Sequence, residues 1–360
     1  MFLKWCIFAK QMLFQSIYYF YYYLFSTKKI LLIIYSNSSM LYSNLKELEE
    51  CLKKQGVKYK VIFNTKSINN IKYIANSSII IIDQSNYFLS YIKLFSSTKV
   101  LQLWHGGGLY KKVAFDKILS LESNKNIIRI YRNVSFLNIS DKKLVDDYSR
   151  MFNIHKENII NYGLPRTDRL FSRDTLKDKK EFLLMYPEIG SKKICLYAPT
   201  FREDTKWQRK LLNVDMEDMV KQLQGYVVIY RAHPTLKISD DIKDIIDVGN
   251  LELDFVLSIT DILISDYSSI IFDYSFFKRP IVLYVPDLKE YFVKKKQLYF
   301  HPSELVGCSN VCYNSTKLAN VVKRATYEID LWDLFMSNCK GNSCQQLVDF
   351  IKDLQIKGDA

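Results

Sequence analysis

The sequence predicts an α/β protein made of two Rossmann-like lobes with a cleft between them. Three observations support this prediction. The chain has 360 residues, which exceeds the usual size of one hydrophobic core. Short β-branched runs alternate with stretches of helical spacing over most of the chain, as they do in doubly wound parallel sheets. A charged segment, 172–190, interrupts the alternation and separates two such series, so it is predicted as the interdomain segment.

The first series begins at residue 29 and forms the predicted N-terminal lobe, 29–171. Its first run, KILLIIY (29–35), is continuously apolar, as expected for a buried parallel strand. Residues 41–56 follow with leucines at helical spacing and a closing glycine. The same design recurs further on, which predicts strands at 58–64, 78–84, 98–106, 133–140 and 158–163, and a polar helix at 141–152.

The second series forms the predicted C-terminal lobe, 191–338. The last segment, 339–360, contains an amphipathic helix with apolar side chains on one face from Leu347 to Leu354. No repeat with a period of 20–50 residues is visible, which excludes a solenoid. The lobe itself has predicted strands at 192–200, 226–234, 261–269 and 279–287, and a predicted helix at 215–225.

Charge and cysteine content narrow the classes of partner. The formal net charge is +13, which suits nucleic acid, anionic lipid or a phosphorylated substrate. No basic run carries interleaved aromatic residues, so we expect no nucleic-acid partner. The seven cysteines contain no Cys-x-x-Cys pair and no zinc-ligand spacing. We therefore expect reduced thiols and no metal site.

Residues 1–28 form an aromatic, apolar segment ahead of the first predicted strand. Its uncharged part, 11–27, lies at the lower length limit for a membrane span and ends in a tyrosine cluster of the kind found at membrane interfaces. No small-residue cleavage site follows it. We predict an interfacial helix that lies in the cytoplasmic leaflet. A membrane-spanning helix and a buried helix of the fold are the alternatives.

Two histidines stand at the ends of predicted strands. Ligands of open α/β sheets bind beyond the carboxyl ends of the strands. The chain has only four histidines, and both His105 and His233 follow apolar strands. Near neutral pH a histidine serves as a general base or as a cation for phosphate. We predict catalytic roles for His105 and His233; a partly buried histidine that caps a loop is the alternative for each.

A phosphate site is predicted beside the strands of the second series. The stretch SDYSS (265–269) offers hydroxyls and backbone N–H groups where a helix begins, although ordinary N-capping would use the same residues. Pro199 fixes a loop and would aim the hydroxyl of the next residue, Thr200. Three arginines are candidates to neutralise a diphosphate. The predicted phosphate-binding residues are Thr200, Arg166, Arg202, Arg231, Ser265, Ser268 and Ser269.

Other chemistries fit the sequence poorly. The glycines at 106–108 are followed neither by the Lys-Ser/Thr of a P-loop nor by the spacing of a dinucleotide fingerprint. No G-x-S-x-G nucleophile elbow occurs. One pair of carboxylates, Asp266 and Asp273, would share a helix face and could meet a metal, but no His/Cys/Asp cluster has metal-ligand spacing.

Five segments stand in a fixed order along the chain: LWHGGGLYKK, YGLPRTDRLF, LYAPTFRED, YRAHP and DILISDYSSIIFDYSFFKRPIVLYVPDLKEY. Together they resemble the CDP-glycerol glycerophosphotransferase family of bacterial teichoic-acid and capsule biosynthesis. The resemblance covers roughly residues 29–355 and implies a GT-B fold with an interdomain cleft and the donor held mainly by the C-terminal lobe. It also implies that the 339–360 helix crosses back toward the first lobe. The family usually continues WHG with Thr-Pro, whereas Gly107 and Gly108 stand here.

The resemblance implies transfer of glycerol phosphate, or a related polyol phosphate, from CDP-glycerol or CDP-ribitol to a hydroxyl. The acceptor would be a lipid-linked saccharide or a growing cell-surface glycan, CMP would be released, and no cofactor would be needed. By position, His105 is the family's proposed base and His233 contacts the donor phosphates. The motif positions associated with donor binding are Arg166, Pro199, Thr200, Ser265, Asp266 and Ser268.

The family also sets expectations about location and competing functions. We expect a peripheral protein on the cytoplasmic face of the bacterial cell membrane, with an anionic membrane surface as a partner. Two other classes stay open. A GT-B glycosyltransferase that uses a nucleotide sugar would share the fold but release a nucleoside diphosphate. A non-catalytic membrane scaffold would bind no CDP-linked compound.

Overall fold

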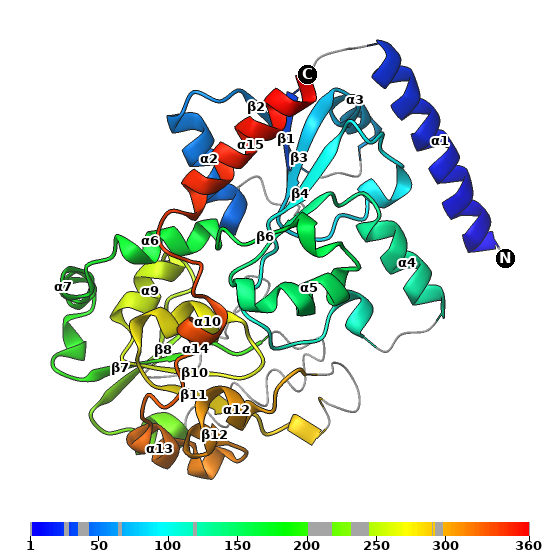
Figure 1. Cartoon of the computed structure of the whole chain (residues 1–360). Helices are drawn as coiled ribbons and strands as arrows, with labels where there is room; N and C mark the ends of the chain where they lie inside the picture. The colour runs from blue at the N-terminus through cyan, green and yellow to red at the C-terminus, as the bar shows by residue number, and fades with distance from the viewer. Residues whose placement is uncertain are drawn as a thin grey trace. The chain divides into compact units, whose positions relative to one another are not determined.

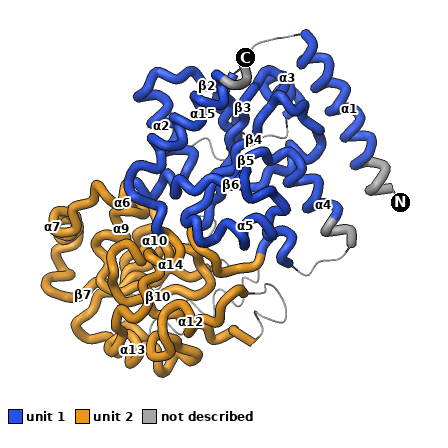
Figure 2. Tube along the Cα trace, viewed as in Figure 1, with its two compact units in different colours: residues 1–106, 113–168, 337–360 blue, residues 107–112, 169–336 orange. Residues whose placement is uncertain are grey.

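The computed structural model describes nine stretches of the chain, which form two compact units (Figure 2). Unit 1 comprises residues 1–106, 113–168 and 337–360, and unit 2 comprises 107–112 and 169–336. Each unit has a sheet of parallel strands with helices packed on it (Figure 1), so the predicted α/β fold with two parallel sheets is confirmed. The described residues are 2–24, 29–34, 43–63, 67–117, 121–200, 218–231, 245–289, 291 and 298–359.

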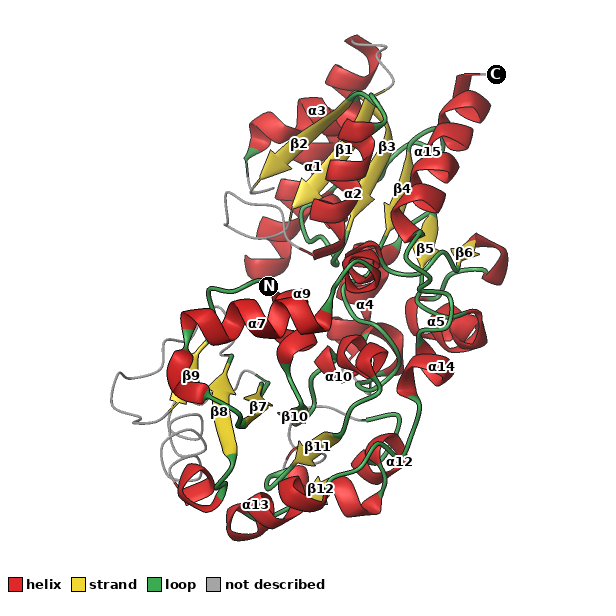
Figure 3. Ribbon diagram, turned by 90° about the vertical axis from the view of Figure 1, so that its left-hand side faces the viewer, coloured by secondary structure: helices red, strands yellow, loops and turns green. Residues whose placement is uncertain are grey.

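The sheet of unit 1 has the strand order β2-β1-β3-β4-β5-β6, and all its neighbouring strands are parallel. The direction of winding reverses between β1 and β3, which makes that gap the topological switch point of the sheet. Figure 3 shows β2, β1, β3 and β4 side by side. The strands are β1 (Lys29–Ile34), β2 (Tyr59–Phe63), β3 (Ser77–Ile82), β4 (Lys99–Gln102), β5 (Phe136–Asn138) and β6 (Ile159–Ile160).

Both faces of this sheet are buried, which explains why its strands are continuous apolar runs. On one face, Ile30 and Leu32 of β1 pack with helices α2 (Ser43–Lys54) and α15 (Ser343–Asp359). On the other face, Leu31 and Ile33 pack with helices α1 (Phe2–Leu24) and α3 (Ile71–Ala75). The C-terminal helix is therefore a layer of unit 1. The remaining helices of this unit are α4 (Leu121–Tyr131) and α5 (Val145–Phe152), and α6 (Asp168–Phe171) lies where the chain enters unit 2.

Helix α1 is packed on one face only. Phe14 and Tyr18 are buried against α3 and residues 88–92. Gln15 accepts a hydrogen bond from the backbone N–H of Lys93 (2.7 Å) and donates one to its carbonyl (3.0 Å). Among the helices that the structure describes, none combines the length and the apolarity needed to cross a lipid bilayer. The opposite face of α1 exposes large apolar side chains: Phe8, Met12, Leu13, Phe20, Tyr23 and Leu24.

The sheet of unit 2 has the order β12-β11-β10-β7-β8-β9, again with parallel neighbours. Numbered along the chain, this is the order 6-5-4-1-2-3 of dinucleotide-binding folds, so its switch point lies between β7 and β10. The strands are β7 (Lys193–Tyr197), β8 (Tyr226–Tyr230), β9 (Ile245–Asp247), β10 (Ile262–Ser265), β11 (Ile281–Tyr284) and β12 (Val311–Cys312).

Helices of unit 2 cover its sheet. Side chains of α13 (Ser315–Arg324) and of the helical stretch 218–222 pack on one face. Helix α7 (Thr175–Met185) lies within the segment 172–190, which the sequence placed between the lobes. It belongs to unit 2 because Phe182 is fully buried and the helix packs on α9. The other helices are α9 (Leu253–Ile259), α10 (Ile270–Tyr274), α12 (Pro302–Val306) and α14 (Leu331–Phe335).

Candidate functional site

His105 follows the carboxyl end of β4 in unit 1, and its side chain is exposed. The residue before it, Trp104, is buried and has a positive φ of 56°. The two rings are in contact, with centroids 4.4 Å apart, and the indole also meets the ring of Phe152 edge-on at 4.7 Å. The exposed imidazole of His105 therefore follows a residue, Trp104, that is buried and has an unusual backbone conformation.

Arg166 lies in the same unit, beside residues that follow other strands of this sheet. Its backbone N–H donates to Oδ1 of Asn44 (3.1 Å), and Nδ2 of Asn44 donates to the carbonyl of Trp104 (2.6 Å). Asp83 follows β3 directly and is buried. Burial raises the pKa of the Asp83 carboxyl to about 6, although the nearby charge of Arg166 lowers it. The carboxyl edge of this sheet thus holds a buried acid and an arginine as well as His105.

The glycine segment after His105 is built into unit 2. Gly108 has a φ of +59°, and a Cβ placed on it would lie only 2.4 Å from a ring carbon of Phe272. Proline, which fixes φ near −65°, therefore does not fit where the family usually has Thr-Pro. The Tyr110 hydroxyl donates to the carbonyl of Asp266 (3.2 Å), and its own carbonyl accepts from Tyr299 N–H (2.9 Å). Gly108 thus serves close packing inside this unit.

The two strands at the switch point of unit 2 are joined by a pair of predicted site residues. Asp266, just after β10, accepts hydrogen bonds from the backbone N–H (2.8 Å) and the hydroxyl (2.7 Å) of Thr200. Thr200 follows Pro199 at the end of β7. Ligands of such sheets bind beyond the strand ends at the switch point, so this pair lies where a nucleotide site is expected.

The other predicted residues of unit 2 surround that point, and several of them already make internal bonds. Ser265 is fully buried, and its hydroxyl donates to the carbonyl of Ala198 (2.7 Å). Arg231 follows β8, and one of its guanidinium nitrogens donates to the carbonyls of Val248 (2.9 Å) and Leu251 (2.7 Å). Burial lowers the pKa of this guanidinium. These two side chains shape the sheet edge from within.

Ser268 and Ser269 lie in the turn between β10 and α10, and both are half-buried. The backbone N–H of Ile270 donates to the Ser268 hydroxyl oxygen (3.3 Å). Helix α10 spans only five residues, so the field of its N-terminus is weaker than that of a long helix. Arg202 and His233 lie outside the described residues.

Sequence reasoning missed a group of aromatic and acidic residues in unit 2. The rings of Tyr267 and Tyr291 are stacked, with centroids 3.6 Å apart and planes at 14°. The Tyr267 hydroxyl donates to Asp287 (3.0 Å), which follows β11. Asp287, and Asp83 in unit 1, stand at the carboxyl ends of predicted strands, as His105 does, so the rule that found His105 could have found them. Nothing in the local sequence pointed to Asn44.

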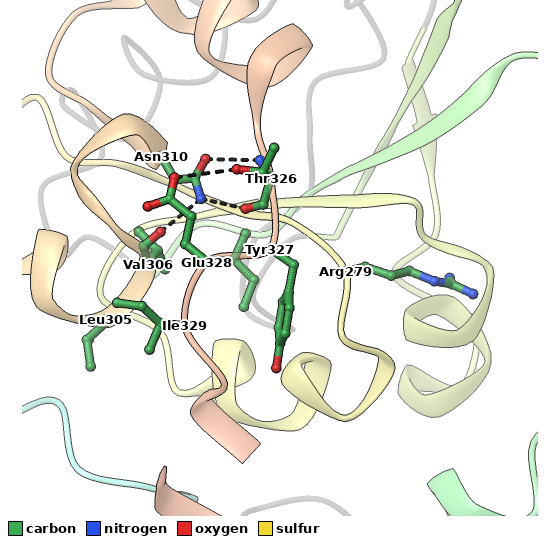
Figure 4. A pocket seen from close by; sticks show the side chains of 9 residues that line it. Arg279, Leu305, Val306, Asn310, Thr326, Tyr327, Glu328 and Ile329 are labelled. Carbon is green, nitrogen blue, oxygen red and sulfur yellow. Dashed lines mark hydrogen bonds between the residues drawn. The ribbon is translucent and has the colours of Figure 1, made fainter. Parts of the chain in front are cut away.

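The predicted site residues that the structure describes form no metal cluster and line no part of the small cavity in unit 2. Among the described residues, no group of three or more His, Cys, Asp and Glu side chains could hold a metal ion. One small cavity of unit 2 lies beside Asn310, Thr326 and Tyr327, and none of the predicted site residues lines it (Figure 4). The guanidinium of Arg279 points away from this cavity, toward the carbonyls of Ser258 and Thr260. The cavity is therefore separate from the strand ends described above.

Comparison with known proteins identifies the same family as the motifs. The sequence model of CDP-Glycerol:Poly(glycerophosphate) glycerophosphotransferase matches residues 18–352. A teichoic acid glycerol-phosphate primase of Bacillus subtilis strain 168 is 33% identical over 296 residues, which are 78% of this chain and 74% of that protein. A teichoic acid ribitol-phosphate primase of Bacillus spizizenii W23 is 26% identical, over 80% of this chain and 78% of that protein.

A solved structure shows the same fold. The wall teichoic acid polymerase TagF superposes with a TM-score of 0.78 over 98% of this chain and 99% of that chain, at 21% identity. Since this identity is low, the likeness concerns the fold. It agrees with the two parallel sheets found here, which are GT-B-like.

Proposed function

This chain belongs to the CDP-glycerol:poly(glycerophosphate) glycerophosphotransferase family, and from that premise we propose that it transfers glycerol phosphate from CDP-glycerol to an acceptor hydroxyl. The acceptor oxygen attacks the phosphorus that bears glycerol, the bond between the two phosphates breaks, and CMP leaves. The product is a phosphodiester of a teichoic acid. The acceptor is a lipid-linked saccharide or a growing glycan of the cell surface.

One observation carries the proposal: the exposed imidazole of His105 stands at the carboxyl end of β4, in the family's WHG motif. The attacking hydroxyl has to lose its proton as the new P–O bond forms. His105 accepts that proton, a role in which a positioned base contributes typically about 10²–10⁴-fold. The rest of the acceleration comes from alignment and charge stabilisation, as in other phosphoryl transfers.

We assign the donor to the carboxyl edge of the unit 2 sheet. The bonded pair Thr200 and Asp266 marks the switch point there, and the hydroxyls of Ser268 and Ser269 lie in the same turn region. His233 and Arg202 also belong to this proposed donor set by their motif positions, although they lie outside the described residues. The TagF polymerase has been solved after a soak with CDPG, and the protein of Bacillus subtilis is named for glycerol phosphate. CDP-glycerol is therefore the first donor to test.

The test is a screen of nucleotide-linked donors with a synthetic lipid-linked disaccharide as acceptor, in which the released nucleotide is identified. We expect CMP from CDP-glycerol, and slower or no release from CDP-ribitol. Release of UDP or GDP from a nucleotide sugar, with no CMP from either CDP-polyol, would contradict the proposal. That result would favour the glycosyltransferase alternative.

We further propose that α1 attaches the protein to an anionic membrane surface on the cytoplasmic side. The support is its uncovered face, on which Phe20 is 62% and Tyr23 77% exposed, together with the net charge of +13. A helix that is packed on one face and aromatic on the other suits the interfacial region of a bilayer.

Sedimentation with phosphatidylglycerol vesicles tests this attachment. The double variant Phe20→Ser/Tyr23→Ser is expected to lose most vesicle binding. Leu184→Ser is the matched control, because Leu184 is 82% exposed on helix α7 of unit 2. Equal vesicle binding by the wild type and the double variant would rule out this face as the attachment site.

A further inference from the structure

Trp104 has a backbone conformation that a large residue seldom adopts. Its φ is 56°, in the left-handed region, and its side chain is only 8% exposed. A bulky residue in this region is a real outlier. Such a conformation persists only where the surroundings enforce it, and it tends to occur at functional sites. This outlier, Trp104, immediately precedes His105, so whatever holds its backbone also bears on the imidazole.

The amide of Asn44 makes the contact that holds the backbone of Trp104. Asn44 is the second residue of α2 and is fully buried. Its Nδ2 donates to the Trp104 carbonyl at 2.6 Å, the carbonyl that leads into His105. Because the imidazole packs on the indole at 4.4 Å, the orientation of Trp104 also sets that of the catalytic ring.

The other end of the same amide binds the second motif of unit 1. Oδ1 of Asn44 accepts from the backbone N–H of Arg166 at 3.1 Å. One side chain therefore ties the WHG segment to the LPR segment. These two segments are 60 or more residues from Asn44 along the chain. An amide offers a donor and an acceptor at once, whereas an ionised carboxylate can only accept.

We infer that Asn44 is a positioning residue for the transfer reaction. It fixes Trp104 in its left-handed conformation, thereby directs the imidazole of His105, and holds the Arg166 backbone in register with it. This inference rests on the function proposed above. Asn44 touches neither substrate nor the reacting atoms in this assignment; it acts through Trp104.

The sharpest variant is Asn44→Asp, which keeps the shape and the acceptor for Arg166 but replaces the donor to Trp104 with an oxygen. We expect kcat for CMP release to fall about 100-fold, a loss that a misplacement of about 1 Å can cause, while KM for CDP-glycerol stays unchanged. Asn133→Asp is the matched control in the same unit. Its Nδ2 donates to the carbonyls of Leu89 (2.9 Å) and Ile92 (2.8 Å), neither of which belongs to the WHG or the LPR segment. We expect its kcat to stay near the wild-type value.

A second measurement reports on the imidazole without turnover. The chain has only four histidines, so the ¹⁵N-imidazole signals can be assigned by single replacements. We expect Asn44→Asp to shift the signal of His105 and to leave that of His155 in place. If Asn44→Asp does not fold, Asn44→Ser replaces it, because its shorter side chain reaches neither partner and adds no charge.

Three results would overturn the inference. The first is equal kinetics for Asn44→Asp and Asn133→Asp, or a change confined to KM. The second is an unshifted His105 signal in the Asn44 variants. The third is a failure of both Asn44 variants to fold, which would make the residue structural. A wild-type protein that releases no CMP would instead refute the proposed function. The His105 signal would still test whether Asn44 positions the imidazole.

Discussion

The carboxyl edges of the two sheets carry similar polar residues but differ in how those residues are exposed and bonded. In unit 1, the edge carries the exposed imidazole of His105, the buried acid Asp83 and a strained Trp104. In unit 2, the predicted residues make hydrogen bonds within the unit: Thr200 donates twice to Asp266, and Ser265 donates to a backbone carbonyl. The edge in unit 1 therefore exposes the imidazole that reacts, whereas hydrogen bonds hold the predicted residues in unit 2.

This difference shows what each edge is suited for. A general base must be reachable by the hydroxyl it deprotonates, so its neighbours have to hold it without covering it. A donor site gains from groups that are already fixed before the ligand arrives, because binding then costs less ordering. Variants of the base and of the donor site should therefore differ in kind: kcat should respond at His105, and KM or stability at Thr200 and Asp266.

The largest expected effect is at His105. His105→Asn should lower CMP release by about 10²–10⁴-fold, because the acceptor hydroxyl loses its base. The melting temperature should stay near the wild-type value, since the imidazole is exposed. His155→Asn is the control, as His155 is also exposed and lies before a short turn. Undiminished turnover in His105→Asn would show that His105 is not the base, and the two edges would then not differ in this respect.

The next effect concerns two glycines of unit 2 with the same backbone angle. Gly108 and Gly190 both have a φ of +59°, but a Cβ on Gly108 would meet Phe272 whereas Gly190 has nothing within 4 Å. Gly190→Ala should lower the free energy of unfolding by about 1–3 kcal/mol through backbone strain alone, because its φ of 59° and ψ of −127° lie in a region that residues with a Cβ rarely adopt. Gly108→Ala should cost roughly 1–3 kcal/mol more through overpacking. Denaturant unfolding measures both, and equal costs would show that Phe272 gives way.

Asp83 should make stability depend on pH. Its pKa is raised from 3.8 to about 6 in the folded state, so the folded protein binds this proton more tightly than the unfolded chain does. The stabilisation is present below about pH 4 and is lost as the pH rises through 6. Relative to Asp83→Asn, the wild type should lose up to about 3 kcal/mol between pH 4 and pH 7. Unfolding curves at four pH values measure this; parallel dependence in the two proteins would contradict it.

The smallest effect compares the two ends of β10. Asp266 follows the strand and Asp261 precedes it, and each accepts a backbone N–H at 2.8 Å, from Thr200 and Ile194 respectively. Changing either to Asn should cost similar stability, because each loses a charged acceptor. Only Asp266→Asn should raise KM for CDP-glycerol, by about tenfold, which corresponds to 1.4 kcal/mol. An equal KM in the two variants would show that the donor does not bind at the carboxyl edge of this sheet.

The sequence by itself determined the class of fold and the chemistry of the strand ends. Strands buried on both faces must be continuous apolar runs, so β1, β3 and β10 were recognisable without any structure. Because ligands bind beyond such strands, the residues after them were the candidates for a site, and His105, Thr200 and Asp266 stand there. The motif order then indicated the family.

Only the tertiary structure decided which of these residues meet. Thr200 and Asp266 are 66 residues apart, and they bond because β7 and β10 are neighbours at the switch point. Gly108 is required by the ring of Phe272, which no local pattern reveals. Asn44 lies 60 residues from Trp104 and 122 from Arg166, yet its amide joins both. Apolar periodicity is a local property that a sequence displays, whereas side-chain partners depend on strand order and long-range packing.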